Sequence, residues 1–362
     1  MCGMDRPYRI AVLPGDGIGQ EVTPQAVRAL EAAGARDALR FAFTEAPIGG
    51  TAYEKMGSSL PPATQDLCLA SDAVLFGAVG GPVLDSLPRE KRGSLLELRR
   101  EMRLSVNLRP STTWEPLMPA SPLRPELIRG ADVLFVRELA GGLYYGPGGH
   151  EVRDGVEIAW DTMLYSAPQV EHVARAAFAL ARGRRRRLTS IDKANVLRSS
   201  RLWRSVVTAV AGDFPDVELE HLIVDNASLQ LIRAPKRFDV VVSENTFGDI
   251  LSDELGALSG SLGMLPSASL AASGPGLFEP VHGCAPDIAG KSLANPLGAI
   301  LSAGLLLEYG LALPEPAARI RDAVGSVLAA GWRTADLMAA AGTQVSTTRM
   351  GDLVVEAIRD AK

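Results

Sequence analysis

Two carboxylates four residues apart are the clearest candidates for chemistry in this chain. Asp249 and Asp253 lie in the stretch FDVVVSENTFGDILSDEL, residues 238–255, where an apolar, β-branched run is followed by apolar residues at helical spacing. On a helix both carboxylates project from the same side. Like charges at this spacing repel, whereas Mg²⁺ or Mn²⁺ prefers hard oxygen ligands on a rigid element. The stretch therefore predicts a strand leading into a helix whose acidic side is either a metal site or a solvated face.

Charged residues also stand where other predicted strands end. Lys193 and Asp225 each follow a short apolar run, and Arg137 follows the run 132–136 and precedes the small-residue turn LAGGLYYGPGG. α/β proteins place binding and catalytic residues at such strand ends. A guanidinium fork suits a carboxylate better than lysine does, whereas an arginine on a helix, such as Arg99, is more often solvated. The pattern indicates function at strand ends, with Arg137 as a candidate for binding a carboxylate.

A glycine-rich turn near the start has the composition of a phosphate loop but the wrong spacing. Residues 9–14 are expected to form a strand and residues 21–33 a helix, with GDGIG between them. Gly15, Gly17 and Gly19 make GxGxG, whereas the dinucleotide-binding fingerprint is GxGxxG followed by an acidic residue. We therefore predict a tight turn that brings backbone close to a ligand, and not a Rossmann phosphate loop.

Composition and charge exclude several classes of partner. The chain has 362 residues, of which 47% are hydrophobic, so it has room for one large or two ordinary domains with a full core. A net charge of -5 and a pI near 5.6 give no general attraction to nucleic acid or to an anionic membrane. The basic run RGRRRR at 182–187 has no flanking aromatic residues for base stacking, so we interpret it as positive charge at the C-terminal end of a helix. We expect a small molecule as the partner.

Cysteine usage and hydropathy indicate a cytoplasmic protein. Cys2, Cys68 and Cys284 are too few and too scattered for a disulfide framework or a zinc cluster. The N-terminus has no basic segment followed by a long apolar core, so no secretory signal is expected. The longest charge-free window, residues 255–278, is broken by Gly, Ser and Pro, which is typical of loops and not of a membrane span.

Motifs along nearly the entire chain, taken in order, resemble the β-decarboxylating dehydrogenases of the isocitrate/isopropylmalate dehydrogenase family. They are LPGDGIGQEV near the start, NLRP at 107–110, RELAGGLYYG at 137–146, DKANVL at 192–197, FGDILSDE at 247–254, GSLGMLPSASL at 260–270 and FEPVHGCAPDIAGKSLANP at 278–296. The resemblance implies a three-layer α/β fold with a mixed sheet and two domains, distinct from the Rossmann fold. Residues 1–104 and 261–362 would form the cofactor-side domain. Residues 105–260 would form the second domain, with the dimer interface and the metal and substrate residues.

The same resemblance assigns the substrate, metal and catalytic residues. The family's arginine clamp for two carboxylates, its apolar contacts and its substrate aspartate correspond here to Arg99, Arg109, Arg137, Leu95, Leu96 and Asp225. The aspartates that hold Mg²⁺ or Mn²⁺ correspond to Asp225, Asp249 and Asp253, and the proton-transfer pair to Tyr144 and Lys193. The family is a homodimer with shared active sites, so Lys193 and Asp225 would reach in from the neighbouring subunit.

The resemblance also implies NAD as the cofactor. The family's loop around the adenosine half of the dinucleotide corresponds here to Glu279, His282, Gly283, Ala285, Asp287, Ile288 and Asn295. Relatives that use NADP carry Lys and then Tyr where this chain has Asp287 and Ile288. An acidic side chain at that position hydrogen-bonds a ribose 2′-hydroxyl and repels a 2′-phosphate.

The reaction implied by the resemblance is the oxidation and decarboxylation of a dicarboxylic 2-hydroxy acid. We expect 3-isopropylmalate as the substrate and 2-oxo-4-methylpentanoate as the product, a step of leucine biosynthesis. Lys193 would take the hydroxyl proton as hydride passes to NAD⁺, and Tyr144 would return a proton to carbon after CO₂ has left.

Two departures from the family pattern leave alternatives open. The loop PREKRGSLLELR is shorter than the family's usual loop, and the glutamate that the family places beside the nicotinamide and the substrate is missing. Arg92 and Gly93 occupy this region instead. The substrate could therefore instead be another 3-substituted malate, tartrate or malate, isocitrate, or homoisocitrate. Cys284 replaces the usual Ser and is either a near-isosteric exchange or a redox-sensitive thiol. A non-catalytic regulatory subunit is disfavoured, because the metal aspartates, Tyr144 and Lys193 are all present.

Overall fold

The computed structural model describes residues 6–92 and 94–360, apart from the side chains of residues 89 and 90, and the chain divides into two compact units. Unit 1 contains the described residues up to Leu104, the segment Thr113–Pro122 and the residues from Gly256 onward. Unit 2 contains Ser105–Thr112 and Leu123–Leu255. Compared with the predicted division at 104/105 and 260/261, the segments 113–122 and 256–260 group with unit 1.

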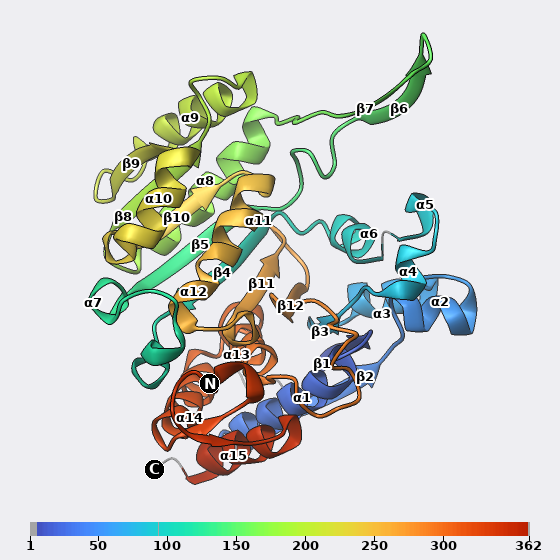
Figure 1. Ribbon diagram of the computed structural model, residues 1–362, viewed down its shortest axis with the longest axis vertical. Helices are drawn as coiled ribbons and strands as arrows, with labels where there is room; N and C mark the ends of the chain where they lie inside the picture. The colour runs from blue at the N-terminus through green and yellow to red at the C-terminus, as the bar shows by residue number, and fades with distance from the viewer. Residues whose placement is uncertain (1–5, 93, 361–362) are drawn as a thin grey trace. The chain divides into compact units, whose positions relative to one another are not determined.

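Unit 1 contains a mixed set of strands in the order β2-β1-β3-β12-β11, in which only β11 is antiparallel to its neighbour β12 (Figure 1). The strands are β1 (Tyr8–Gly15), β2 (Phe41–Glu45), β3 (Ala73–Ala78), β11 (Pro266–Leu270) and β12 (Gly276–Pro280), with a separate small pair of β13 (Trp332–Arg333) and β14 (Thr343–Gln344). The helices are α1 (Gly19–Ala35), α2 (Gly50–Met56), α3 (Pro62–Ala70), α4 (Pro82–Asp85), α5 (Arg89–Arg92), α6 (Ser94–Glu101), η1 (Glu115–Ala120), α12 (Gly256–Ser259), η3 (Leu262–Met264), α13 (Leu297–Leu305), η4 (Leu306–Gly310), α14 (Pro314–Ala329), η5 (Ala335–Leu337) and α15 (Thr347–Asp360).

The core of unit 1 forms around β3, which is buried at every residue. A parallel strand covered on both faces has this pattern. α1 packs against β1 and β3 and also against α13 and α15, so helices from both ends of the chain enclose the same core. The predicted tight turn after β1 is confirmed. Gly15 has φ +73°, and a Cβ there would lie 2.0 Å from the carbonyl oxygen of Ala78, so only glycine fits.

Unit 2 contains a mixed set of strands in the order β4-β5-β10-β8-β9, in which only β4 is antiparallel to its neighbour β5. The strands are β4 (Val106–Thr112), β5 (Asp132–Glu138), β8 (Arg187–Asp192), β9 (Glu218–Ile223) and β10 (Val240–Ser243), with a separate hairpin of β6 (Gly148–Arg153) and β7 (Val156–Asp161). The helices are α7 (Pro125–Ile128), α8 (Ala167–Arg182), α9 (Arg198–Ala211), α10 (Val224–Arg233), η2 (Pro235–Arg237) and α11 (Asn245–Glu254).

The central strands of unit 2 are covered on both faces. β10 is buried at every residue, and β5 at every residue but its first. α8 and α9 pack on each other and on the strands, and α10 and α11 contact β8, β9, β5 and β10. α8 begins with a capping box in which Ser166 and Gln169 satisfy each other's backbone amides. In the part of the chain that is described, no helix is both long and apolar enough to cross a bilayer.

The basic run at 182–187 begins at the last residue of α8, as predicted, and carboxylates of unit 2 pair with its arginines. Arg182 pairs with Asp216 at 2.5 Å on the surface. Arg184 Nε lies 2.8 Å from the buried Asp239, which also accepts a hydrogen bond of 2.8 Å from the backbone amide of Arg185. These arginines therefore help to fix the turn between α8 and β8.

Replacing Asp239 by asparagine is expected to destabilise the protein more than the same change at Asp216. Asp239→Asn keeps the shape but leaves Arg184 without its buried counter-charge, so the free energy of unfolding should fall by about 1–3 kcal/mol. Asp216→Asn removes a solvent-exposed pair and should cost much less. Urea denaturation of the two variants measures both, and equal losses would contradict an anchoring role for Asp239.

Candidate active site

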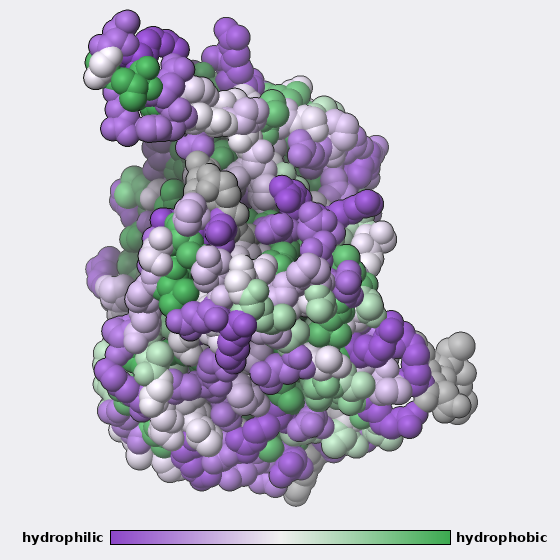
Figure 2. All heavy atoms as spheres, turned by 90° about the vertical axis from the view of Figure 1, so that its right-hand side faces the viewer, coloured by the Kyte–Doolittle hydropathy of each residue, from purple (hydrophilic) through white to green (hydrophobic). Residues whose placement is uncertain are grey.

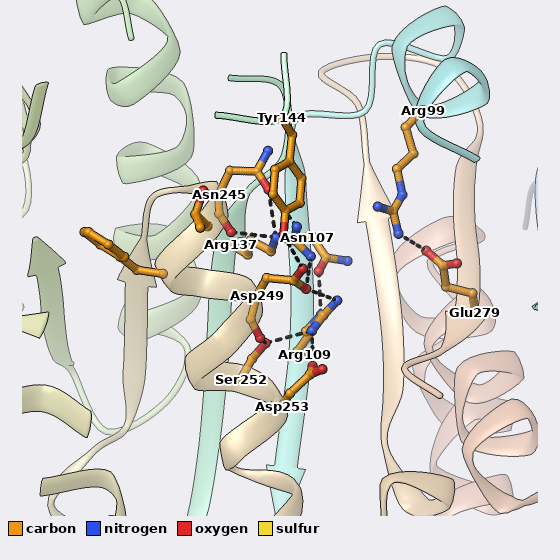
Figure 3. A network of polar contacts seen from close by, with 12 residues as sticks. Arg99, Asn107, Arg109, Arg137, Tyr144, Asn245, Asp249, Ser252, Asp253 and Glu279 are labelled. Carbon is orange, nitrogen blue, oxygen red and sulfur yellow. Dashed lines mark hydrogen bonds and ion pairs between the residues drawn. The ribbon is translucent and has the colours of Figure 1, made fainter. Parts of the chain in front are cut away.

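The side chains of Asn107, Arg109 and Arg137 lie on one face of unit 2. Residues two apart in a strand share a face, so Asn107 and Arg109 of β4 point the same way. Asn107 lies opposite Arg137 in the antiparallel register of β4 and β5. α11 packs on β5 and brings Asp249 and Asp253 to the two arginines (Figure 3). The prediction that both carboxylates project from one side of a helix is confirmed.

Asp249 is the centre of a network of ion pairs (Figure 3). Its Oδ1 lies 3.0 Å from Arg109 Nη2 and also pairs with Arg137 Nη1. Its Oδ2 accepts a hydrogen bond of 2.8 Å from the Tyr144 hydroxyl, and the Arg137 guanidinium lies 5.5 Å from the centre of the Tyr144 ring. Arg109 Nη1 lies 2.6 Å from Asp253 Oδ1. The structure thus brings together five of the predicted site residues.

The arginines of this network are enclosed, whereas the aspartates reach solvent. The side chains of Arg109 and Arg137 are 10% and 2% exposed, and those of Asp249 and Asp253 are 29% and 48% exposed. Burial raises the pKa of Asp253, against the opposing effect of Arg109. Burial, together with the hydrogen bond to Asp249, raises the pKa of Tyr144, so its hydroxyl keeps its proton at neutral pH. Carboxylate oxygens on the open side of the network are suitable ligands for Mg²⁺ or Mn²⁺.

Asp225 does not join Asp249 and Asp253 within one chain. Among residues 6–92 and 94–360, no group of three or more His, Cys, Asp or Glu side chains is placed to hold a metal ion. Asp225 lies in the first turn of α10 and pairs with Lys193, which follows β8. Because β8 and β9 are parallel neighbours, these two residues lie at the same edge of the strands. The Asp225 side chain is 65% exposed and is open to another molecule.

The third arginine of the predicted clamp, Arg99, belongs to α6 in unit 1. Its Nη2 lies 2.6 Å from Oε1 of Glu279 on β12, and both side chains are buried. The resemblance assigns Glu279 to the cofactor loop and gives no sign of this ion pair. On the same helix Leu95 is half-buried and Leu96 is 39% exposed. Gly93, in the shortened loop before α6, lies outside the described residues.

The loop that carries most of the predicted cofactor residues is attached to the start of α1. The backbone amide of Ile18 donates to the carbonyl of Cys284 at 2.9 Å. The carboxylate of Glu21 accepts hydrogen bonds from the amides of Gly290 at 2.5 Å and Ser292 at 2.9 Å. Residues far apart in the sequence therefore hold this loop in place within unit 1.

The same loop contains a buried nitrogen without a hydrogen-bond partner. His282 Nε2 is buried and has no hydrogen-bond partner in the described structure, and burial lowers the pKa of the ring, which is neutral at pH 7. A small rearrangement of the loop would make this nitrogen available to a ligand or to water. Asn295 Nδ2 donates to Asp336 Oδ2 at 3.0 Å. The other predicted cofactor residues of this loop are exposed or partly exposed, namely Gly283, Ala285, Asp287 and Ile288.

Sequence reasoning missed the polar residues that support the network in unit 2. These are Asn107, Glu138, Tyr165, Glu244 and Asn245, all of them buried. One usable signal was the polar pair Ser243 and Glu244 directly before α11, because a polar residue at that place is a candidate cap. Glu244 has this role, and its carboxylate accepts hydrogen bonds from the first free amides of α11.

Two of these residues are carboxyl groups that share one buried neighbourhood. Glu138 accepts hydrogen bonds from the amides of Ala140 at 2.7 Å and Gly141 at 3.0 Å, at the start of the loop that carries Tyr144. The Tyr165 hydroxyl donates to Glu244 at 3.1 Å. Burial raises the pKa of Glu138 to about 7, and the negative charge of Glu244 acts in the same direction.

Comparisons with known proteins agree with each other. A family profile described as isocitrate/isopropylmalate dehydrogenase matches residues 9–354. A 3-isopropylmalate dehydrogenase of Geobacillus kaustophilus is 55% identical, over 98% of this chain and 96% of its own length. One of Moorella thermoacetica is 53% identical, over 96% of this chain and 98% of its own. The crystal structure of an isocitrate dehydrogenase from Methylococcus capsulatus superimposes with a TM-score of 0.87 at 34% identity, covering 98% of this chain and 100% of that one.

Glu138 is expected to make the stability of the protein depend on pH. Its pKa is about 7 in the folded chain against an ordinary value of 4.5, so folding takes up a proton between these values. Stability is therefore lost as pH rises through this window and is constant above it. Glu138→Gln should lose less stability than wild type between about pH 5 and about pH 8. Urea denaturation at both pH values measures this loss. Glu171→Gln is the control, because Glu171 forms an exposed pair with Arg175. If the free energy of unfolding changed equally with pH in wild type and Glu138→Gln, the raised pKa of Glu138 would be contradicted.

Proposed function

Because the chain belongs to the isocitrate/isopropylmalate dehydrogenase family, we propose that it oxidises and decarboxylates 3-isopropylmalate to 2-oxo-4-methylpentanoate in leucine biosynthesis. It is a β-decarboxylating dehydrogenase, like the curated relatives that it resembles over nearly its full length. The observation in the structure that carries the proposal is the network of Arg109 and Arg137 with Asp249 and Asp253. Enclosed guanidinium groups suit the carboxylates of such an acid, and the exposed aspartate oxygens suit a divalent cation.

The proposed cofactors are NAD⁺ and Mg²⁺ or Mn²⁺. NAD⁺ would accept the hydride, and the cation would stabilise negative charge on the substrate oxygens. Asp249 and Asp253 would hold the cation together with Asp225 of the partner subunit. In unit 1 the neutral, buried ring of His282 would accept or donate one hydrogen bond to the adenosine half of the cofactor. The exposed carboxylate of Asp287 would select a free ribose 2′-hydroxyl.

The protein's own groups would bind the substrate and move its protons. Arg109 and Arg137 would exchange their aspartate partners for substrate carboxylates, with Arg99 as the third arginine of the clamp. Lys193 would accept the proton of the hydroxyl group as hydride leaves. Tyr144 would donate a proton to carbon after loss of CO₂, and its raised pKa keeps this proton on the hydroxyl at neutral pH until then.

A homodimer with shared sites is part of the same proposal. The hairpin β6–β7 extends away from the rest of unit 2 (Figure 1), and Figure 2 shows hydrophobic groups among hydrophilic ones on this arm. An isolated two-stranded hairpin is marginally stable in water. Val152, Val156 and Trp160 on this hairpin are 67%, 62% and 45% exposed, and Ile250 on α11 is 62% exposed. Such apolar groups favour burial against a second copy, which would also supply Asp225 and Lys193.

The cytoplasm is the proposed location. The described cysteines, Cys68 and Cys284, are free and buried, in agreement with a reducing compartment.

Turnover assays are the direct test of substrate, cofactor and metal. Purified protein with Mg²⁺ should form NADH from 3-isopropylmalate with kcat/KM at least about tenfold above that for benzylmalate, isocitrate, homoisocitrate, tartrate or malate. Leu95 and Leu96 should favour an apolar substituent over a third carboxylate. NADP⁺ should be a poor substitute for NAD⁺, and a chelator should abolish turnover until Mg²⁺ or Mn²⁺ is restored. Preference for another acid would overturn the substrate, and no turnover with any of them would favour a regulatory subunit.

Mixed dimers test whether the sites are shared. Lys193→Ala and Tyr144→Phe homodimers should each lose about 10²–10⁴-fold in rate, because each lacks one proton-transfer group. Dimers formed from one chain of each kind would contain one intact site. Random mixing should therefore restore roughly a quarter of wild-type activity, since half of the dimers are mixed. The absence of any recovery in the mixture would show that Lys193 and Tyr144 act within the same subunit.

A further inference from the structure

Each arginine of the network in unit 2 is held by a buried asparagine at the edge that faces away from the aspartates (Figure 3). Arg109 Nε donates to Asn107 Oδ1 at 2.9 Å. Arg137 donates to Asn245 Oδ1 through Nε at 3.0 Å and through Nη2 at 2.7 Å. Both asparagines are 0% exposed. Neither residue has a role in the proposed reaction.

The backbone fixes these asparagines independently of any ligand. Asn107 precedes Arg109 by two residues on β4, so the two side chains project from the same face of the strand. Asn245 is the first residue of α11, and its Nδ2 also donates to the carbonyl of Gly141 at 3.0 Å. Because both oxygens stand on regular elements, each guanidinium has one fixed edge and directs its remaining Nη groups to Asp249 or Asp253.

The asparagine amide carries no charge, and this matters for the charge of the arginine beside it. An aspartate at either place would accept the same hydrogen bond and would pair more strongly with a buried guanidinium. It would also cancel the positive charge that a substrate carboxylate needs. A buried amide orients the arginine through a hydrogen bond and leaves its full charge available to a ligand.

We propose that Asn107 and Asn245 are positioning residues that orient Arg109 and Arg137 for the two carboxylates of the substrate while preserving their charge. This inference rests on the proposed role of the two arginines. Affinity for a dicarboxylate then depends on two buried asparagines in addition to the arginines that touch the ligand. The asparagines act through the guanidinium groups and not on the reacting atoms.

The test compares aspartate and alanine at position 107, whose side-chain oxygen accepts from Arg109 Nε. Asn107→Asp keeps the hydrogen bond to Arg109 Nε but adds a negative charge, so the KM for 3-isopropylmalate should rise at least about tenfold. Asn107→Ala removes the hydrogen bond but leaves the charge of Arg109, so the KM should rise less. The melting temperature should fall in both variants, because alanine loses the hydrogen bond and aspartate adds an unbalanced buried charge.

The KM for 3-isopropylmalate separates positioning from a purely structural role. If the amide only supported the fold, both variants would lower the melting temperature and leave this KM unchanged. The KM for NAD⁺ should stay unchanged in both variants. Ser111→Ala is the matched control, since Ser111 Oγ donates to the carbonyl of Leu255 at 2.8 Å from the same face of β4 without touching an arginine. It should lower the melting temperature and leave the KM for 3-isopropylmalate unchanged.

Two reference variants distinguish failure of the inference from failure of the proposed function. Arg109→Lys and Arg137→Lys should each raise the KM for 3-isopropylmalate, because lysine lacks the planar fork. If both leave it unchanged, the proposed role of the arginines is wrong and the inference falls with it. If both raise it while Asn107→Asp binds 3-isopropylmalate as wild type does, the inference alone is overturned. Asn245→Asp should repeat the rise in KM, with an additional loss of stability because its bond to Gly141 is lost.

Discussion

The structure of unit 2 depends on the pairing of two enclosed arginines with two partly exposed aspartates. Asp249 alone contacts Arg109, Arg137 and Tyr144. Buried ions are stable only when their charges are balanced, and this group of four is neutral as a whole. A dianionic acid and a divalent cation are also neutral together, so their joint entry preserves the balance. Either ligand alone leaves one sign of charge in excess in a region of low dielectric. The network thus favours both ligands together over either one.

Two strands and one helix make this balance possible, because they place the charged side chains of the network on one face of unit 2. The antiparallel register of β4 and β5 sets Asn107 opposite Arg137, and α11 brings Asp249 and Asp253 against them. Glu244 satisfies the first amides of α11 at its buried start. The arginines and aspartates of the network are therefore positioned by two strands and one helix, and Tyr144 is added by the loop after β5.

Much of the fold and part of the site could be predicted because their signals are local or lie in motifs. The predicted family and fold class are confirmed, and the spacing of Asp249 and Asp253 correctly indicated one helix face. The pair of Arg99 and Glu279 could not be predicted, because 180 residues separate its members and nothing in either neighbourhood marks them as partners. The same holds for Asn245, whose side chain meets Arg137 from 108 residues away. Local patterns identify elements, whereas buried polar pairs depend on how those elements pack.

The two units also differ in the order in which their residues are synthesised. Nearly all of unit 2 is one continuous stretch, Leu123–Leu255, whereas unit 1 combines the first part of the chain with everything from Gly256 onward. β3 needs β12 as a neighbour, and α1 needs α13 and α15 to cover it. β1, β3 and α1 therefore carry uncovered apolar faces until the residues from Gly256 onward are made. Unit 2 can complete its own strands and helices in the meantime. This chain order makes the folding of unit 1 depend on the segment that is synthesised last.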